Sequence, residues 1–160
     1  MAEPALTLEI VEQAGDWSGF DAEALLRDVP GAVAARAPAV GLATVVLADD
    51  ATLRDLNSRF RGKDKPTNVL SFPAGTQLVP GEEPYLGDIV VSRETLLREA
   101  EDEGKSPPHH FIHLVTHGIL HLLGHDHIDE HDAIRMETLE VEILVKLGLS
   151  DPYAETASAL

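Results

Sequence analysis

The segment His109–His131, HHFIHLVTHGILHLLGHDHIDEH, decides the fold of this 160-residue chain. It contains all eight histidines of the sequence, although it is only a small part of the chain. His117 and His121 are four residues apart, so their imidazoles would lie above one another on one face of a helix. We therefore predict that this pair binds one metal ion.

The apolar side chains around the pair predict a helix that is buried on most of its circumference. They are Leu114, Val115, Ile119, Leu120 and Leu123. Gly124 follows at the position where a residue in the left-handed conformation would end the helix. Beyond it, His125 or His127 can bring a third imidazole back to the metal, and the spacing does not decide between them. Three imidazoles leave a fourth tetrahedral position for water, as in catalytic zinc sites.

The remaining histidines are His109, His110, His113 and His131. We expect each of them to be solvated or to hydrogen-bond a ligand of the metal, and not to be a ligand itself. The alternative to a specific site is a histidine-rich surface helix that binds metals adventitiously. That alternative requires neither apolar helix faces nor a helix-ending glycine, so the specific site is favoured.

The spacing HxxxHxxGxxH resembles the zinc-protease signature HExxHxxGxxH, with one difference. Gly118 stands where that signature has the glutamate that acts as general base. A peptidase of that type would be badly impaired without its base. A zinc peptidase or amidase is therefore an alternative function, and we expect the metal to serve a different chemistry.

Length and composition indicate one domain in the cytoplasm. A chain of 160 residues is long enough for one hydrophobic core. The absence of cysteine excludes disulfides and thiolate ligands, and the start MAEPALTLEI lacks the basic and apolar regions of a signal peptide. No run approaches the roughly 20 apolar residues of a membrane span, so we expect a cytoplasmic protein with no membrane partner.

The charges of the chain are unevenly distributed. The net charge is −16, which opposes non-specific binding to nucleic acid. Five of the twelve lysines and arginines nevertheless lie in one short segment: Arg54, Arg59, Arg61, Lys63 and Lys65. Only Asp55 and Asp64 oppose them within that segment. This cationic patch, together with the metal, is where we expect an anion to bind.

Four short segments have the apolar patterns of β-strands. They are residues 5–11, 41–48, 68–72 and 86–91. The apolar run 41–48 predicts a central strand. Pro73 is expected to end the strand at residues 68–72. Because a helix is expected between the second and third strands, we predict a right-handed parallel crossover there. Residues 73–85 contain three prolines and two glycines and predict a loop that overhangs a site.

Capping residues predict where the helices begin and end. The expected N-caps are Asp21, Asp49 or Asp50, Ser92 and Ser106, and the expected ends include Gly62, Glu103 and Gly148. Pro30 should break or kink the first helix, and the sequence leaves open whether one helix or two result. Leu53, Leu56 and Phe60 have helical spacing, which predicts a helix over this segment.

A long amphipathic helix is expected after the histidine loop, where Met136 has helical spacing with Leu139 and Ile143 and is assigned to the core. Residues 149–160 are expected to form a frayed tail. These elements predict an α+β (mixed α/β) domain that spans residues 1–160. A small mixed four-stranded sheet would be covered by about five helices, with the zinc-binding helix at its centre.

Three blocks of the sequence resemble the YbeY family of bacterial metal-dependent endoribonucleases and rRNA maturation factors. They are RGKDKPTNVLSFP at residues 61–73, LGDIVVS at residues 86–92 and HGILHLLGHDH at residues 117–127. The zinc ligands that the resemblance implies are His117, His121 and His127. It also implies a functional role for Arg61. His125 and Asn68 differ from the residues of many relatives, and neither position is a matched ligand.

The resemblance further implies a zinc-dependent endoribonuclease that cleaves single-stranded RNA, matures the 3′ end of 16S rRNA and takes part in ribosome quality control. Its expected partners are the small-subunit rRNA precursor, the 30S ribosomal subunit and assembly factors, with no DNA partner. Zinc on three imidazoles would lower the pKa of a bound water to about 7 and activate it for attack on a phosphodiester. A non-enzymatic ribosome assembly factor with a structural metal is the other alternative.

Arg61 is expected to stabilise negative charge on the phosphate oxygens through its guanidinium fork. Its alternative role is that of a cation near a helix C-terminus. Arg59, Lys63 and Lys65 are expected to bind the RNA backbone. The alternative is that they are ordinary surface residues. Asp126 is expected to accept a hydrogen bond from a ligand imidazole or to be a turn residue. The sequence identifies no general base.

Overall fold

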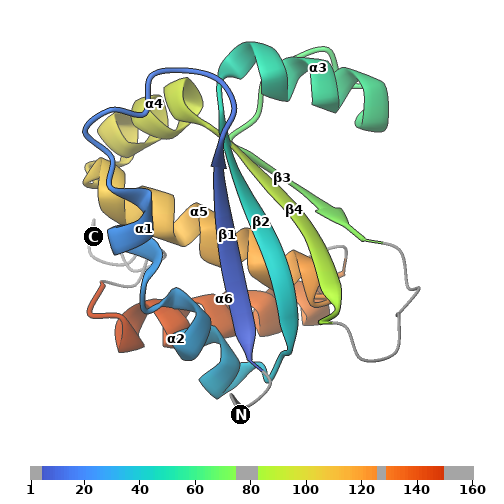
Figure 1. Cartoon of the computed structure of the whole chain (residues 1–160), viewed down its shortest axis with the longest axis vertical. Helices are drawn as coiled ribbons and strands as arrows, with labels where there is room; N and C mark the ends of the chain where they lie inside the picture. Colours follow the sequence, from blue (N-terminus) through green and yellow to red (C-terminus); the bar gives the residue numbers. More distant parts are fainter. Residues whose placement is uncertain (1–4, 75–82, 126–128, 150–160) are drawn as a thin grey trace.

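The four expected strands form one mixed sheet in the computed structural model, which describes residues 5–74, 83–125 and 129–149 (Figure 1). The strands are β1 (Leu6–Glu12), β2 (Gly41–Ala48), β3 (Val69–Pro73) and β4 (Tyr85–Ser92). Their order is β1-β2-β4-β3, so β2 is an internal strand, as its apolar run predicted. Pro73 is the last residue of β3, and it is tolerated there because β3 is an edge strand.

The predicted parallel crossover between β2 and β3 is wrong. β4 lies between these strands, parallel to β2 and antiparallel to β3. The reason is the position of α3 (Asp50–Arg61), which lies at the end of the sheet where β2 finishes (Figure 1). Because α3 does not return the chain to the other end, β3 runs against β2 and pairs with β4, the next strand along the chain.

Six helices occur within the described residues. Besides α3 they are α1 (Ala22–Leu26), α2 (Val29–Arg36), α4 (Arg93–Glu103), α5 (Pro107–Leu122) and α6 (Glu130–Lys146). The expected number was about five, and the additional helix results from Pro30. This proline occupies the first turn of α2, where its missing N–H does no harm, and α2 is thereby separate from α1.

Most of the predicted caps are confirmed. The side chains of Asp21, Asp49 and Ser106 each accept a hydrogen bond from a backbone N–H of the first helical turn. Gly62 ends α3 in the left-handed conformation, with φ of 69°. Ser92 is the N-cap residue of α4 as predicted, but its hydroxyl donates to Asp50 at 2.5 Å and does not cap its own helix.

The main core lies between the sheet and α5, with α2 and α6 on the same side of the sheet (Figure 1). Val45 and Ile89 of the sheet meet Phe111 and Ile119 of α5 in this core, and all four are fully buried. Met136 of α6 is 1% exposed, which confirms its assignment to the core. No helix in the described ranges is both long and apolar enough to cross a lipid bilayer.

Gly118 allows α5 to lie directly against the sheet. A Cβ atom added at Gly118 would lie 2.6 Å from Cγ2 of Ile89 and 3.1 Å from Oγ of Ser71. The Ser71 hydroxyl donates a hydrogen bond to the carbonyl oxygen of Gly118 at 3.2 Å. This close approach brings the histidines on either side of Gly118 next to β3.

Candidate metal centre

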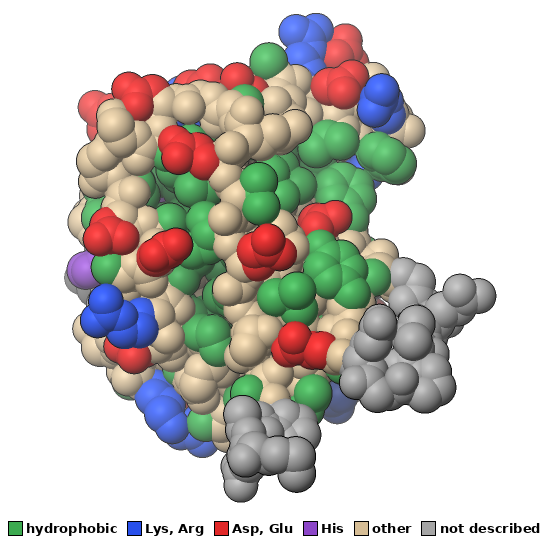
Figure 2. Space-filling view, in the orientation of Figure 1, with side chains coloured by type: hydrophobic (Ala, Val, Ile, Leu, Met, Phe, Trp, Pro, Cys, Tyr) green, Lys and Arg blue, Asp and Glu red, His purple; other side chains and the backbone are tan. Residues whose placement is uncertain are grey.

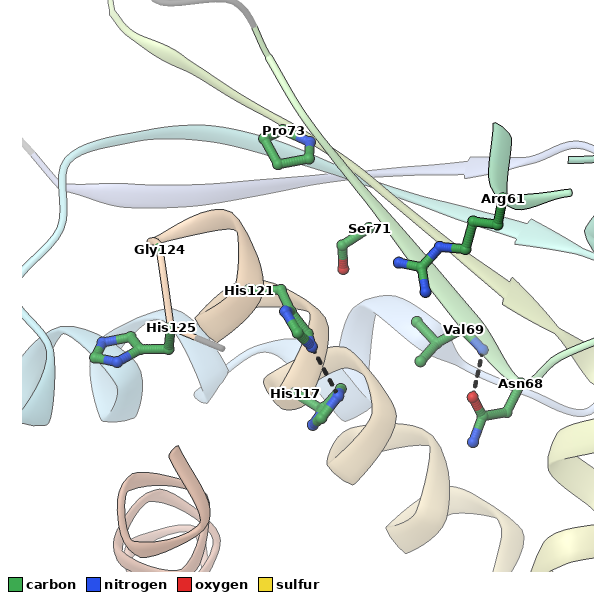
Figure 3. A pocket seen from close by; sticks show the side chains of 9 residues that line it. All are labelled: Arg61, Asn68, Val69, Ser71, Pro73, His117, His121, Gly124 and His125. Carbon is green, nitrogen blue, oxygen red and sulfur yellow. Dashed lines mark hydrogen bonds between the residues drawn. The ribbon is translucent and has the colours of Figure 1, made fainter. Parts of the chain in front are cut away.

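A cavity of about 420 Å³ opens between α5, β3 and the end of α3 (Figure 3). Its lining comprises Arg61, Asn68, Val69, Ser71, Pro73, His117, His121, Gly124 and His125. β3 contributes Val69, Ser71 and Pro73 because alternate side chains of a strand point to the same face. The histidine pair of α5 faces them, so the cavity joins parts of the chain that are distant in the sequence.

His117 and His121 form the predicted pair. Their Nε2 atoms are 3.1 Å apart, and their ring centroids are 4.7 Å apart. In a tetrahedral site with zinc–nitrogen distances of about 2.0–2.1 Å, two ligand nitrogens are separated by about 3.3 Å. The pair therefore has nearly the spacing that two ligands of one zinc ion require.

Glu140 of α6 orients His117. Its carboxylate is 1% exposed and accepts hydrogen bonds from Nδ1 of His117 and from Nε2 of His113, the latter at 3.2 Å. Because a carboxylate only accepts, His117 carries its proton on Nδ1, and Nε2 is left to bind a metal. A ligand histidine that donates to a carboxylate in this way is held in the correct tautomer and is a stronger base.

Glu140 was missed by the sequence analysis, although the sequence contains a signal for it. Met136 and Leu144 lie one turn before and after Glu140 on α6, and both are 1% exposed. A glutamate between two core positions of one helix face must be buried, and a buried carboxylate requires hydrogen-bond donors. The histidines of α5 are the donors that the rest of the sequence offers.

The other histidines divide into three groups. His113 shares Glu140 with His117, which fits the expectation of a histidine that supports the site. His109 and His131 are exposed, as expected. His110 differs from both expectations because it is 3% exposed and donates from Nε2 to Glu99 at 2.9 Å.

Asn68 connects the cavity to a second polar network. Its Nδ2 donates to Glu99 at 3.0 Å, and its Oδ1 accepts from the backbone N–H of Val69 at 2.7 Å. Burial raises the pKa of Glu99, but hydrogen bonds from His110 and Asn68 outweigh this effect and hold the pKa below its usual value. An ionised Glu99 therefore fixes Asn68 in the cavity wall.

A second group of metal-ligand side chains lies in this network. Glu99, Glu103 and His110 have ligand atoms within 4.8 Å of one another. These atoms already have partners, because His110 and Asn68 donate to Glu99, and Lys105 pairs with Glu103 at 3.1 Å. We therefore assign this group a structural role in joining α4, α5 and β3.

Arg61 is the cation that reaches the cavity. It lies in the last turn of α3, and its guanidinium extends toward the space between Ser71 and Asn68 (Figure 3). Among the described residues Arg61 forms no salt bridge, whereas Arg59 pairs with Asp55 at 3.6 Å. Four members of the cationic patch are exposed and lie outside the cavity lining: Arg54, Arg59, Lys63 and Lys65.

His125 lies at the rim of the cavity, but its ring points away from His117 and His121 (Figure 3). Asp126 and His127 lie outside the described residues. The assignment of His127 as the third ligand, and the role of Asp126, therefore stay predictions.

Known proteins resemble this chain over most of its length. A family model described as Endoribonuclease YbeY matches residues 21–148. Relatives named Endoribonuclease YbeY from Chelativorans sp. and Parvibaculum lavamentivorans are 50% and 45% identical over 157 residues each. The first alignment covers 96% of both chains, and the second covers 92% of this chain and 85% of the relative. The chain belongs to the YbeY endoribonuclease family.

YbeY membership confirms the resemblance of the three sequence blocks and the expectation of a hydrolase that acts on RNA phosphodiester bonds. The fold is also similar to a solution structure of a Thermotoga maritima protein, with a TM-score of 0.55 at 23% sequence identity. That comparison covers 88% of this chain and 91% of the other. It supports the predicted α+β fold with its four-stranded mixed sheet.

Gly118 separates this YbeY-family chain from the zinc-protease signature. The protease glutamate would occupy this position, but its Cβ alone would collide with Ile89 of β4 and press on Ser71 of β3. A general base cannot be introduced there without moving the helix away from the sheet. Gly118 is therefore the ground on which both the sequence and the structure oppose the peptidase alternative.

Proposed function

We propose that this chain is a zinc-dependent endoribonuclease that hydrolyses a phosphodiester of single-stranded RNA. The observation that carries the proposal is the position of His117 and His121 on one wall of the cavity and Arg61 on another. The first wall supplies nitrogen ligands for a divalent cation, and the second supplies a guanidinium suited to phosphate oxygens. A phosphodiester requires both, because negative charge develops on its oxygens as water attacks.

We propose His117, His121 and His127 as the zinc ligands. The 3.1 Å separation of the Nε2 atoms and the hydrogen bond from Nδ1 of His117 to Glu140 support the first two. For His127, the support is Gly124, whose φ of 97° turns the chain just after α5. Zinc bound there would supply positive charge and a water molecule with a pKa near 7.

The side chains of the protein hold the other reacting groups. Arg61 binds the phosphate oxygens and stabilises their charge in the transition state. Glu140 keeps His117 in the tautomer that binds metal, and Asp126 accepts a hydrogen bond from another ligand imidazole. Within the described residues no aspartate or glutamate lines the cavity, so no carboxylate there is assigned as general base.

The RNA backbone continues from the cavity onto the exposed cationic patch. Arg59, Lys63 and Lys65 hold it there, while the net charge of −16 repels polyanions from the rest of the surface. The proposed substrate is the small-subunit rRNA precursor, cut to form the 3′ end of 16S rRNA in the cytoplasm. The 30S subunit and its assembly factors are proposed partners in this step and in ribosome quality control. DNA is not proposed as a partner. Membership of the YbeY family supports these assignments.

The decisive experiment compares RNA and peptide cleavage by one protein preparation. We expect the zinc-loaded protein to cleave single-stranded RNA, to lose this activity on chelation and to regain it with added zinc, while casein and short peptides stay intact. Zinc-dependent proteolysis without RNA cleavage would select the peptidase alternative. RNA binding with no cleavage of either polymer would select a non-enzymatic assembly factor with a structural metal.

A further inference from the structure

Phe60 is exposed, although it has helical spacing with a core residue of α3. Leu53 is fully buried, whereas Phe60 is 64% exposed. This is the largest value among the exposed large hydrophobic side chains that the structure describes. The last turn of α3 lies against β3, the edge strand of the sheet, and β3 covers only part of the Phe60 ring. The ring of Phe60 is therefore not a core side chain.

Phe72 of β3 holds this exposed ring in place. The two ring centroids are 5.3 Å apart with an interplanar angle of 66°, an edge-to-face contact. Phe72 itself is partly buried against a small cluster that contains Leu53, Leu70 and Val90. The contact uses only part of the Phe60 surface. Phe60 is thus a positioned aromatic side chain whose ring stays accessible to another flat group.

The aromatic pair lies directly beside the metal cavity. Phe60 precedes Arg61 on α3, and Phe72 lies between Ser71 and Pro73 on β3. The three neighbours all line the cavity. Because successive side chains of a strand point to opposite faces, Phe72 lies on the other side of the edge strand from Ser71 and Pro73. A polymer that leaves the cavity over this edge therefore passes the ring of Phe60.

The charge of the surroundings indicates what kind of partner fits the ring. Phe60 lies between Arg59 and Arg61 in the cationic patch of a chain whose net charge is −16. Figure 2 shows hydrophobic side chains below the end of α3, and Lys and Arg side chains beside Asp and Glu side chains on that helix. An aromatic face among cations is the combination by which proteins bind single-stranded nucleic acid, with bases on the ring and phosphates on the cations.

We propose that Phe60 stacks on an unpaired base of single-stranded RNA, next to the phosphate held at Arg61. The proposal rests on the proposed function in that it names a subsite for the same substrate. Such a subsite favours single-stranded over double-stranded RNA, because a paired base is stacked on its own neighbours and cannot lie on the ring. Every base has an aromatic face, so the subsite accepts bases of any sequence.

The test uses the zinc-loaded full chain with Phe60→Ala, Phe60→Leu and Phe60→Trp. Phe60→Leu keeps an apolar contact with Phe72 but cannot stack, and Phe60→Trp enlarges the ring. Ile134→Ala is the matched control, because Ile134 is 56% exposed on α6. Each variant is titrated with a short single-stranded RNA and with an abasic RNA of equal length. Melting temperature and zinc content are measured to show that each variant is folded.

We expect Phe60→Ala and Phe60→Leu to bind the RNA about 10- to 100-fold more weakly than the wild type. The abasic RNA should bind these variants and the wild type alike. Phe60→Trp should bind at least as tightly as the wild type, and the RNA should quench its indole fluorescence, because the only natural tryptophan, Trp17, is buried. Unchanged RNA binding by Phe60→Leu, or a fluorescence of Phe60→Trp that RNA does not change, would overturn the proposal.

Binding and cleavage are measured separately so that the two proposals can fail independently. If the wild type binds RNA through Phe60 but never cleaves it, the endoribonuclease proposal fails and the stacking subsite stands. If the wild type cleaves RNA and Phe60→Ala binds and cleaves like the Ile134→Ala control, the stacking subsite is wrong and the proposed function stands.

Discussion

Glu140 on α6 accepts a hydrogen bond from Nδ1 of His117 on α5, although the two residues are 23 positions apart in the chain. The same carboxylate accepts from His113 one turn earlier on α5. The candidate metal centre therefore extends beyond the histidine motif to a second helix. The packing of α6 against α5 decides how well the first ligand is oriented.

Glu140→Gln should lower the affinity for zinc by about 10- to 100-fold, as loss of a partner to a ligand histidine typically does. The amide has nearly the shape of the carboxylate, but it carries no negative charge to strengthen the imidazole as a base. Competition with a chromophoric chelator measures the affinity. Glu137→Gln, at an exposed position of the same helix, is the control and should bind zinc like the wild type. Equal affinities in both variants would show that Glu140 does not position His117.

Substitution of single histidines should separate ligands from neighbours. His117→Ala, His121→Ala and His127→Ala should each lose most of the bound zinc, because two imidazoles hold the ion much more weakly than three. His125→Ala should keep its zinc, since the ring of His125 points away from the pair. Elemental analysis of the purified variants measures the content. An empty His125→Ala protein beside a full His127→Ala protein would reverse the assignment of the third ligand.

The sequence predicted the features that depend on local chemistry. Asp49, Gly62 and Ser106 mark helix ends by hydrogen bonds and dihedral angles that involve only nearby residues, and all three are confirmed. The His117–His121 pair was predictable for the same reason, because one helical turn determines its geometry. These features need no knowledge of how the helices and strands pack together.

The features that the sequence did not predict depend on contacts between distant segments. β3 runs antiparallel to β4 because α3 keeps the chain at the end of the sheet where β2 finishes. The helical pattern of α3 does not specify this position. The exposure of Phe60 has the same origin, because its helical spacing with Leu53 does not show how much of its ring the edge strand β3 covers. Glu140 supports the site only because α6 packs on α5. Its spacing with Met136 and Leu144 predicts a buried carboxylate but does not predict which side chains donate to it.

Gly118→Ala should lower the free energy of unfolding by about 1–3 kcal/mol, because the added methyl group overpacks the contact with β4. Its Cβ would lie 2.6 Å from Cγ2 of Ile89. Gly31→Ala is the matched control, since Gly31 is also helical and nothing lies within 4 Å of the added Cβ. That variant should be about 0.4–1 kcal/mol more stable than the wild type. Urea denaturation measures both, and a Gly118→Ala protein as stable as Gly31→Ala would contradict the close helix–sheet approach.

Asp50 should make folding stability depend on pH. Burial raises its pKa, but hydrogen bonds from Ser92, Thr95 and Arg98 together outweigh burial and hold the pKa below the ordinary 3.8. A carboxyl group with a lowered pKa contributes stability above its ordinary pKa, and this contribution is lost as the pH falls through the lowered value. Asp50→Asn should therefore be less stable than the wild type near neutral pH by roughly 1.5–3 kcal/mol.

The difference between Asp50→Asn and the wild type should shrink as the pH is lowered through the acid range below 3.8. Asp102→Asn removes the same charge from an exposed position of α4 and serves as the control. Denaturation of the three proteins at a series of pH values measures the effect. A difference that does not change with pH would mean that the ionised form of Asp50 contributes nothing to stability.

Arg61→Ala should lower kcat by roughly a hundred- to a thousandfold, the usual result of removing one electrostatic donor from a transition state, or about 2.7–4 kcal/mol. Zinc content and melting temperature should stay close to those of the wild type, because Arg61 is exposed and lies across the cavity from the histidine pair. Arg61→Lys should recover part of the rate, since a point charge does not reproduce the guanidinium fork. Single-turnover cleavage at saturating RNA measures the chemical step alone.

Arg59→Ala gives the contrasting result that makes the Arg61 prediction specific. Arg59 lies outside the cavity lining, so its loss should weaken RNA binding several-fold and leave kcat unchanged. Added salt should reproduce that effect in the wild type, because salt screens contacts between exposed cations and the RNA backbone. If Arg61→Ala shows this same pattern, with a higher KM and an unchanged single-turnover rate, then Arg61 only attracts RNA. A loss of rate that saturating RNA does not restore would place its guanidinium on the reacting phosphate.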